Sequence, residues 1–513
     1  MERKSRETKN IGQQIKQLTA LILENRKNVN CIVDIINKSE TDDSDVLVAC
    51  VKAFCQVFVA FIDSSEMYLE QETEVYSDTS ASNKEVQLKV WLRQRYEAVC
   101  ERLLQLLYNQ DTIVQELALC TLMRLVKAEG IKPLRKLSKK QLYFPAKFFQ
   151  RILEQLVSEE DDFTLLLGRF EEYLEFDDVR YYVLKFLLAA IAKKQTKVVE
   201  DIFLRNVFAL LENMAFSSTS DGPLTNFLSK PPEDETTKIC SLQEQKKLFT
   251  TVWLTFLKFK LSTSLYRKVL LILHDKVMPY MTSPLLLSDF LTNSYNIGGA
   301  ISLLSLNGLF ILVNKYNLNY PDFYGKLYAL FEPNVFHVKY KARFFFLADL
   351  FLTSTHLPAY LVAAFVKRLA RIVLTAPPTG QMLAIPFIYN LIYRHPSCKV
   401  LLHRPDGPKD IEEDVYRMDE PDPVKCCALE SSLWEIKTLQ NHYHPDVSAA
   451  AQKIEHPLQE REEELKDLLE LTGDNLFEKE MKKKMKTVPM TFDPPKGLFT
   501  YKDDKMSQCW SLE

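Results

Sequence analysis

Hydrophobic residues recur along most of the chain with the spacing of an α-helix rather than the alternation of a β-strand. In the clearest stripe, apolar residues fall at i, i+4, i+8 and i+11 and therefore share one helix face. Its members are Leu361, Phe365, Leu369 and Ile372. The first predicted helices are Ile11–Asn37, Ser44–Glu72, Lys84–Asn109, Thr112–Ala128, Lys140–Ser158, Asp162–Leu174, Asp178–Lys193 and Val198–Met214. Those that follow are Leu242–Lys260, Ser264–Tyr280, Leu285–Thr292, Gly298–Lys315, Pro321–Phe331, Lys339–Leu352, Pro358–Leu374, Met382–Tyr393, Ala428–Asn441, Asp446–Ile454 and Leu458–Leu471.

The helical periodicity is lost in three places, which we interpret as boundaries. Ser217–Glu235 gathers serine, proline, glycine and acids, the composition of an exposed loop or linker. His403–Val424 is acidic and contains prolines, and the tail from Gly473 carries the lysine-rich Lys479–Lys486. The predicted organisation is N-terminal helical repeats at 1–216, a linker at 217–240, a C-terminal helical domain with a basic face at 241–402, an acidic irregular segment at 403–427, terminal helices at 428–472 and an extended basic tail at 473–513.

Glycine is scarce, with 12 in 513 residues against a usual ~7%. Nucleotide-binding α/β folds and turn-rich β-proteins need glycine at tight turns, so the composition argues against both classes. Helix pairs joined by short connections instead predict an all-α fold, an α-solenoid of degenerate HEAT-like or armadillo-like repeats. Such stacks present long surfaces that hold extended partners. A set of compact helical bundles is the alternative architecture.

Two uncharged stretches raise the possibility of membrane crossing, since 290–314 spans 25 residues and 372–393 spans 22. The first contains asparagines, serines and glycines, while the second contains three prolines and reads as a loop followed by a short helix. A helix that is apolar all round is also expected at the centre of a large helical stack. We therefore favour buried helices and regard membrane contact as the alternative.

The net charge of −3 conceals a strong local asymmetry. Residues 290–405 hold 11 Lys and Arg against 3 Asp and Glu, whereas 406–422 hold 8 acids against 2 bases. One interpretation is unevenly charged solvated surface. The other is a basic face for RNA or an acidic partner, beside an acidic strip that docks elsewhere or guards that face.

Six cations on two neighbouring predicted helices are the candidate binding residues. The group at 367–371 lies on the side of its helix away from the apolar stripe. The group at 339–343 lies at the start of the preceding helix and includes two cations four residues apart. Such clusters grip phosphates, and ordinary surface cations that cover a core are the alternative interpretation. The six are Lys339, Lys341, Arg343, Lys367, Arg368 and Arg371. The neighbouring Phe344, Phe345 and Phe346 are predicted to pack in the core rather than to stack on bases.

The sequence offers no catalytic signature, because it lacks a glycine-rich phosphate loop, a nucleophile elbow and an HExxH motif. The one mixed cysteine and histidine cluster has adjacent cysteines, which do not leave the gap that a zinc chelate loop needs. Its members are Cys426, Cys427, His442 and His444. We therefore predict no enzyme activity, no metal, no cofactor and no small-molecule substrate. Ten scattered cysteines fit a reducing compartment.

Four long blocks in the second half carry a family resemblance: Ile301–Pro333, Phe336–Leu352, Leu357–Pro378 and Ala428–Ser448. In these blocks the chain resembles the nucleolar-complex and CCAAT-binding-factor family of ribosome assembly proteins. The resemblance implies a nucleolar factor of the small-subunit processome that works with a larger nucleolar protein, on pre-ribosomal particles and with possible pre-rRNA contact. It carries over no catalytic residue.

We therefore expect a non-enzymatic scaffold in the nucleus and nucleolus, active in rRNA processing and small-subunit maturation. Two alternatives remain from the residues themselves. The uncharged stretches allow a multi-pass protein of the nuclear membrane, although we expect no membrane contact. The helical stack also allows a transport-receptor-like solenoid that carries soluble cargo.

Overall fold

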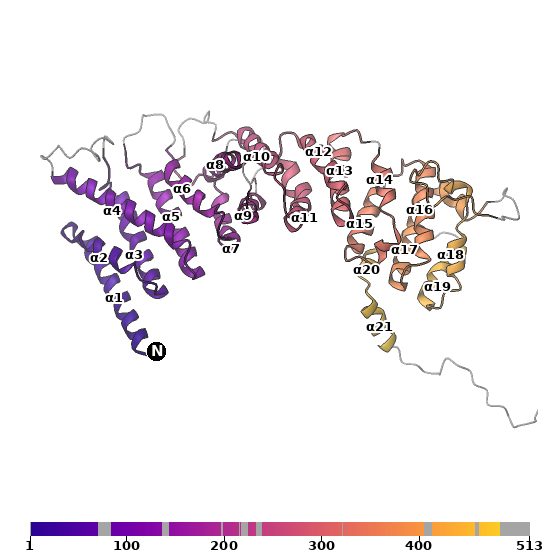
Figure 1. Ribbon diagram of the computed structural model, residues 1–513, viewed down its shortest axis with the longest axis horizontal. Helices are drawn as coiled ribbons and strands as arrows, with labels where there is room; N and C mark the ends of the chain where they lie inside the picture. Colours follow the sequence, from indigo (N-terminus) through magenta and orange to yellow (C-terminus); the bar gives the residue numbers. More distant parts are fainter. Residues whose placement is uncertain are drawn as a thin grey trace, which may run out of the picture. The chain divides into compact units, whose positions relative to one another are not determined.

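The computed structural model divides into two compact units, residues 1–320 and 321–513 (Figure 1). Within the ranges that it describes, helices are joined by turns, and the only β pairing there is an isolated bridge between Leu69 and Arg135. The described ranges are 2–69, 84–135, 143–195, 199–214, 216, 224–231, 239–320, 322–404, 413–456 and 461–482.

The first unit stacks its helices in two layers. In one layer α1 packs on α3, α3 on α5, α5 on α7 and α7 on α9 (Figure 1). In the other layer α2 packs on α4, and α8 packs on both α6 and α10. The bounds are α1 Glu2–Glu24, α2 Cys31–Lys38, α3 Ser44–Asp63, α4 Lys84–Leu106, α5 Thr112–Ile131, α6 Ala146–Leu156, α7 Thr164–Leu174, α8 Asp177–Lys194, α9 Asp201–Glu212, α10 Leu242–Phe256, α11 Thr263–Ile272, α12 Ser288–Tyr295 and α13 Gly299–Tyr316. The predicted all-α solenoid is confirmed.

Several helices of the first unit begin at polar caps. The carboxylate of Asp43 accepts from the backbone N–H of Asp45 at 3.1 Å, and that of Asp111 accepts from Ile113 at 2.9 Å. The hydroxyl of Ser241 accepts from the N–H of Glu244 at 3.4 Å. These bonds satisfy backbone donors that have no partner within the first helical turn.

Two predicted single helices are interrupted. The expected helix at 11–37 is divided between α1 and α2, and at the break Asn25 accepts from the N–H of Lys27 while the amide of Asn28 donates to the Leu21 carbonyl. Asparagine side chains thus replace the helical bonds of the backbone. The expected helix at 264–280 passes from α11 into a π-helical turn and then a 3₁₀ turn at Met278–Tyr280, where Pro279 has no N–H to continue an α-helix.

The segment predicted as an exposed linker is partly docked. Over its described part, 224–231, the Asp178 carboxylate at the start of α8 accepts from the N–H groups of Leu228 and Ser229, at 3.0 and 2.9 Å. Gly130 of α5 meets the same loop so closely that an added Cβ would lie 2.7 Å from the Ser229 Cβ. Helix α10 also packs on α8 and so joins 241–320 to the preceding helices. The two units therefore divide at 320/321 rather than at the predicted 240/241.

The second unit is centred on α16 and α17, which pack on each other. Helix α19 packs on α17, and the short α20 packs on both α15 and α17. Gly380 of α17 permits close packing, because an added Cβ would lie 2.6 Å from the Phe336 ring. The helices are α14 Phe323–Ala329, α15 Lys341–Phe351, α16 Ala359–Val373, α17 Pro378–Arg394, α18 Trp434–Leu439, α19 Pro445–Gln452, α20 Lys466–Leu469 and α21 Gly473–Lys482.

The tail does not begin as the extended segment that we predicted, because 473–482 forms α21. Asp474 in its first turn and Lys479 and Lys482 in its last turn complement the helix dipole, and Lys479 pairs with Asp446 of α19 at 2.9 Å. The rest of the predicted basic tail, 483–513, lies outside the described residues.

In the described chain, two helices are long and apolar enough to cross a membrane by length and composition alone, α3 and α13. Most of each helix is buried within the first unit. The uncharged stretch 290–314 is not one continuous helix, since Gly298, with a φ of +92°, separates α12 from α13. Likewise 372–393 comprises the end of α16, a loop and most of α17.

Candidate interaction surface

The three predicted cations of α16 lie where the helix packs against a later segment of the second unit. The apolar stripe of this helix is buried, as its spacing predicts. Lys367 is also fully buried, and Arg371 is largely covered. The segment that covers them is 413–435, which includes the end of the acidic strip.

Lys367 and Arg371 form a compact ionic network with two carboxylates. Nζ of Lys367 lies 2.7 Å from Oε1 of Glu435 and 2.9 Å from Oδ2 of Asp414, and it donates to the Ser432 carbonyl at 2.6 Å. The Arg371 guanidinium lies 2.6 Å from Oδ2 of Asp414 and 2.8 Å from Oε1 of Glu435. Two cations and two carboxylates therefore neutralise one another out of contact with most of the solvent.

Trp434 covers this network from the outside. Its indole N–H donates to Oδ2 of Asp414 at 2.8 Å, and the Arg371 guanidinium stacks over its ring with 4.7 Å to the centroid. Burial raises the pKa of Asp414, but hydrogen bonds from Ser431, Lys367 and Trp434 outweigh it and hold this pKa well below its usual range. Asp414 is therefore a carboxylate at any physiological pH.

Arg368 faces a different neighbour. Its Nε donates to the Phe331 carbonyl at 2.8 Å and its Nη1 to the Met418 carbonyl at 3.2 Å. The guanidinium also lies over the Tyr328 ring, 4.4 Å from the centroid, and the Tyr328 hydroxyl is 2.9 Å from that of Tyr416. Arg368 thus joins the region of α14 to the acidic strip itself, at Met418.

The acidic strip therefore docks on the α16 cations themselves, at Asp414. The predicted basic face is not uniformly accessible: Lys367 has no exposed surface, and its charge is matched within the chain. Whether Lys367, Arg368 and Arg371 also contact RNA or an acidic partner stays a prediction, and their geometry shows a structural use.

Sequence reasoning missed Asp414, Glu435 and Trp434 as partners of these cations. A signal was present on α16, where Lys367 is flanked at i−4 and i+3 by Ala363 and Ala370, both fully buried. Alanines at these spacings mark a face that another segment approaches closely. The identity of that segment depends on contacts across more than forty residues, as between Lys367 and Asp414, which periodicity does not reveal.

The other three predicted cations surround the start of α15. Lys339 and Arg343 are exposed, whereas Lys341 is half-buried, and burial lowers its pKa. On the same outward face, Phe346 is 59% exposed and Leu350 is 45% exposed. Arg343, Phe346 and Leu350 follow one another on α15 at intervals of three and four residues, and Lys339 lies in the turn just before the helix begins. We refer to these four residues as the α15 stripe.

The exposure of Phe346 shows that the prediction was wrong in placing all three consecutive phenylalanines in the core. Phe344 and Phe345 are buried, but successive residues on a helix are about 100° apart, so the third leaves the buried face. An exposed large aromatic beside an exposed arginine is typical of a contact surface.

The cluster of cysteines and histidines has local roles. The Cys426 thiol is buried and lies 3.1 Å from the Pro423 carbonyl. Nδ1 of His444 accepts from the N–H of Asp446 at 3.3 Å, which caps α19. Over the part of the chain that the structure describes, no group of three or more potential metal ligands is present.

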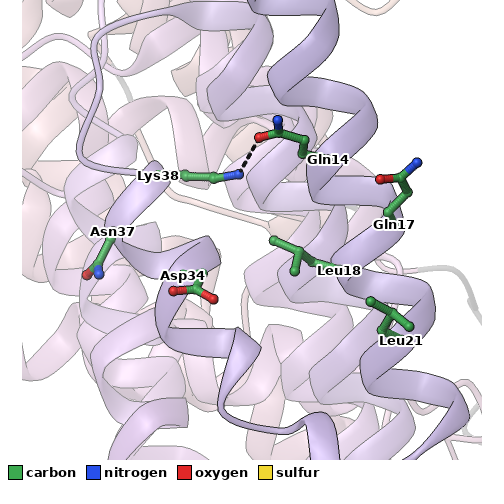
Figure 2. A pocket seen from close by; sticks show the side chains of 7 residues that line it. All are labelled: Gln14, Gln17, Leu18, Leu21, Asp34, Asn37 and Lys38. Atoms are coloured by element: carbon green, nitrogen blue, oxygen red, sulfur yellow. Dashed lines mark hydrogen bonds between the residues drawn. The ribbon is translucent and has the colours of Figure 1, made fainter.

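A surface groove with a volume of about 540 Å³ lies between α1 and α2. Figure 2 shows the side chains that line it. At one end, Nζ of Lys38 donates to Oε1 of Gln14 at 3.0 Å. The lining combines amides and leucines, so it does not identify a chemical class of ligand. The lining residues are Gln14, Gln17, Leu18, Leu21, Asp34, Asn37 and Lys38.

Two family matches cover most of the chain. Residues 302–451 match the CBF/Mak21 family, and residues 4–197 match the family described as Nucleolar complex protein 4-like, TPR repeats. The second match refines the predicted repeat type, since its repeats are described as TPR rather than HEAT or armadillo. The first match contains α15 and α16, and it confirms the family resemblance seen in the sequence.

Several full-length relatives are similar over nearly the whole chain. "Nucleolar complex protein 4 homolog B" of Xenopus laevis is 47% identical, over 96% of this chain and 94% of its own length. "Nucleolar complex protein 4 homolog" of Homo sapiens is 44% identical, over 96% of each chain. The Danio rerio protein of the same name is 44% identical, over 97% of this chain and 96% of its own.

Proposed function

Because the chain belongs to the nucleolar complex protein 4 family, we propose that it is a non-enzymatic scaffold in assembly of the small ribosomal subunit. Its location is the nucleolus, within the nucleus, in keeping with the names of its relatives. It acts on pre-ribosomal particles together with a larger nucleolar protein, in the small-subunit processome and in rRNA processing. We assign it no catalytic residue and no cofactor.

One observation carries this proposal beyond family membership, the exposed α15 stripe. Lys339 and Arg343 supply positive charge, and Phe346 and Leu350 supply apolar area that the unit itself does not bury. A cation pair four residues apart suits phosphate or carboxylate groups, while an exposed phenylalanine and leucine suit a protein surface or an unstacked base. The stripe therefore fits attachment to a ribonucleoprotein particle.

The experiment compares two matched variants of the full chain in nucleolar extract. Arg343→Glu with Phe346→Ser changes the α15 stripe, and Lys399→Glu with Val400→Ser makes the same two kinds of change at another exposed site of the unit. We expect the first variant to leave the fractions of a density gradient that contain small-subunit precursors, and the second to remain there.

If both variants sediment equally with the precursors, the α15 stripe is not required for attachment to the particle. Sedimentation of the wild type away from every pre-ribosomal fraction would reject the assembly function itself. Retention in a carbonate-washed membrane pellet would favour the nuclear-membrane alternative, and stable capture of nucleoporins would favour the transport-receptor alternative.

A further inference from the structure

An apolar groove in the first unit lies between the ends of α3 and α5, well separated in sequence from the α15 stripe. It has a volume of about 610 Å³. Its walls come from α3 and α5, with Leu23 of α1 at its edge. The groove exists because α1 and α5 pack on either side of α3 and leave one stripe of α3 uncovered.

The two walls run in the same direction and in register. Arg124 of α5 contacts the Cys55 sulfur at 4.0 Å, and Lys132, just beyond α5, donates to the carbonyl of Asp63 at the end of α3. In both contacts the two residues are 69 positions apart in sequence, so moving along α3 and along α5 proceeds in the same direction. The two helices are therefore parallel here. The groove follows the two helices for about two turns, or roughly 10 Å. This length lets a bound helix place two side chains, one turn apart, in the groove.

Each wall presents residues at i, i+3, i+4 and i+7, the spacing of one helix face. On α3 these are Gln56, Val59, Ala60 and Asp63, and on α5 they are Arg124, Lys127, Ala128 and Ile131. An alanine occupies the same i+4 place on both walls, so the floor is low and another backbone can approach closely. At the rim, Leu23 and Ile131 are 47% and 45% exposed, which leaves apolar area available on both sides.

The charged residues that line the groove indicate which kind of partner it can bind. Arg124 and Lys127 stand exposed on the α5 wall, and neither forms an ion pair with any residue that the structure describes. Asp63 lies on the opposite wall, so the positive side of the groove is the α5 side. The lining contains no aromatic ring on which a base could stack, which disfavours single-stranded nucleic acid.

We propose that this groove binds an amphipathic helix of a partner protein, with an apolar face on Val59, Ala60 and Ala128 and acidic side chains toward Arg124 and Lys127. The partner is recognised as an acidic helix laid into a hydrophobic groove. This site goes beyond the proposed function, because it gives the first unit a protein contact of its own.

The test uses the full chain and two labelled, stapled helical peptides of about four turns each. Both peptides carry the same leucine stripe, and their flanks carry either glutamates or lysines. We expect the glutamate peptide to bind in a fluorescence anisotropy titration, and the lysine peptide to bind at least about tenfold more weakly.

Two pairs of matched variants localise the binding. Arg124→Glu with Lys127→Glu should weaken the glutamate peptide about tenfold and improve the lysine peptide, while Lys147→Glu with Lys193→Glu, on exposed positions of α6 and α8, makes the same charge change elsewhere and should have no effect. Ala60→Arg should fill the groove and abolish binding, and Ala192→Arg on the exposed side of α8 should not. Circular dichroism confirms that each variant is folded.

Three results would overturn the proposal. The first is absence of binding by the glutamate peptide, or loss that is equal in the groove and the control variants. The second is tighter peptide binding after Phe477→Ser with Met481→Ser, two exposed residues of α21, because the chain's own helix would then be the occupant. The third is dimerisation that the Ala60→Arg variant abolishes, which would make the occupant a second copy.

Discussion

Helices α15 and α16 of the second unit both carry clustered cations, and the fold treats the two clusters differently. Lys367 of α16 is fully buried between Asp414 and Glu435, while Arg343 of α15 is exposed beside Phe346. The neighbours decide the outcome. Small alanines beside the α16 cations admit a covering segment, whereas large side chains beside Arg343 remain at the surface.

A basic cluster in a helical protein can therefore have two physical uses. A buried cluster needs matched carboxylates from the same chain, since unpaired buried charge is costly. An exposed cluster costs little by itself, because water solvates its charges. Both kinds of cluster look alike in the sequence, because each is a local excess of lysine and arginine. Only the burial and the neighbours of the cations show whether a cluster holds the fold together or faces the solvent.

Reversal of the buried charge of Lys367 should destabilise the protein more than any other substitution considered below. Lys367→Glu would place three carboxylates together, with Arg371 as their remaining cation, and should destabilise the second unit by about 3–5 kcal/mol. Lys367→Met should cost less, because it adds no repulsion. Native-state hydrogen exchange of α16 measures both values, and the exposed Arg343→Glu should change them by less than about 0.5 kcal/mol. A similar small change for Lys367→Glu would show that the network is not structural.

The first unit contains a buried carboxyl group that has no ion-paired cation among the described residues, in contrast to Asp414 and Glu435. Glu129 of α5 accepts from the Tyr96 hydroxyl, and burial raises its pKa to about 7, with Glu97 adding repulsion and Arg93 opposing it. Because the folded pKa is raised, its contribution is present below about pH 4.5 and is lost as the pH rises through 7.

Stability of the first unit should therefore fall by up to about 3 kcal/mol between pH 5 and pH 8, and Glu129→Gln should remove that fall. Hydrogen exchange of α5 at several pH values provides the measurement. A wild type and a glutamine variant with parallel pH profiles would show that Glu129 titrates normally.

The opposite sign is expected for Asp414. Its folded pKa is lowered, so its contribution is present above the ordinary value of 3.8 and is lost as the pH falls below it. Asp414→Asn should cost about 1–3 kcal/mol at neutral pH, because Lys367 and Arg371 then share one carboxylate. The difference between wild type and variant in α16 exchange should shrink in acid, and a difference that grows in acid would reverse this assignment.

Helical periodicity predicted most of the fold. It placed α5 and α16 close to their observed bounds, because apolar residues at i, i+3 and i+4 report directly on burial of a helix face. It also placed the start of α3 correctly, but it extended that helix to Glu72, whereas α3 ends at Asp63. It failed between α1 and α2, where the side chains of Asn25 and Asn28 compete with the backbone, and at 473–482, where a polar helix has little apolar stripe to detect.

The candidate surface was predictable only in part. The sequence located both cation clusters and the acidic strip, but the docking of Asp414 on Lys367 is a long-range contact that local pattern does not encode. The exposure of Phe346 could have been inferred, since three consecutive phenylalanines do not share one helix face. The groove between α3 and α5 required the register of two separate helices.

The different roles of the two cation clusters can be tested by comparing lysine reactivity in the free protein and in the pre-ribosomal particle. A water-soluble acylating reagent followed by mass spectrometry reports each lysine separately. We expect that Lys339 reacts in the free protein and is protected in the particle, while the buried Lys367 is unreactive in both. Ready modification of Lys367 in the folded free protein, or equal reactivity of Lys339 in the two states, would contradict this expectation.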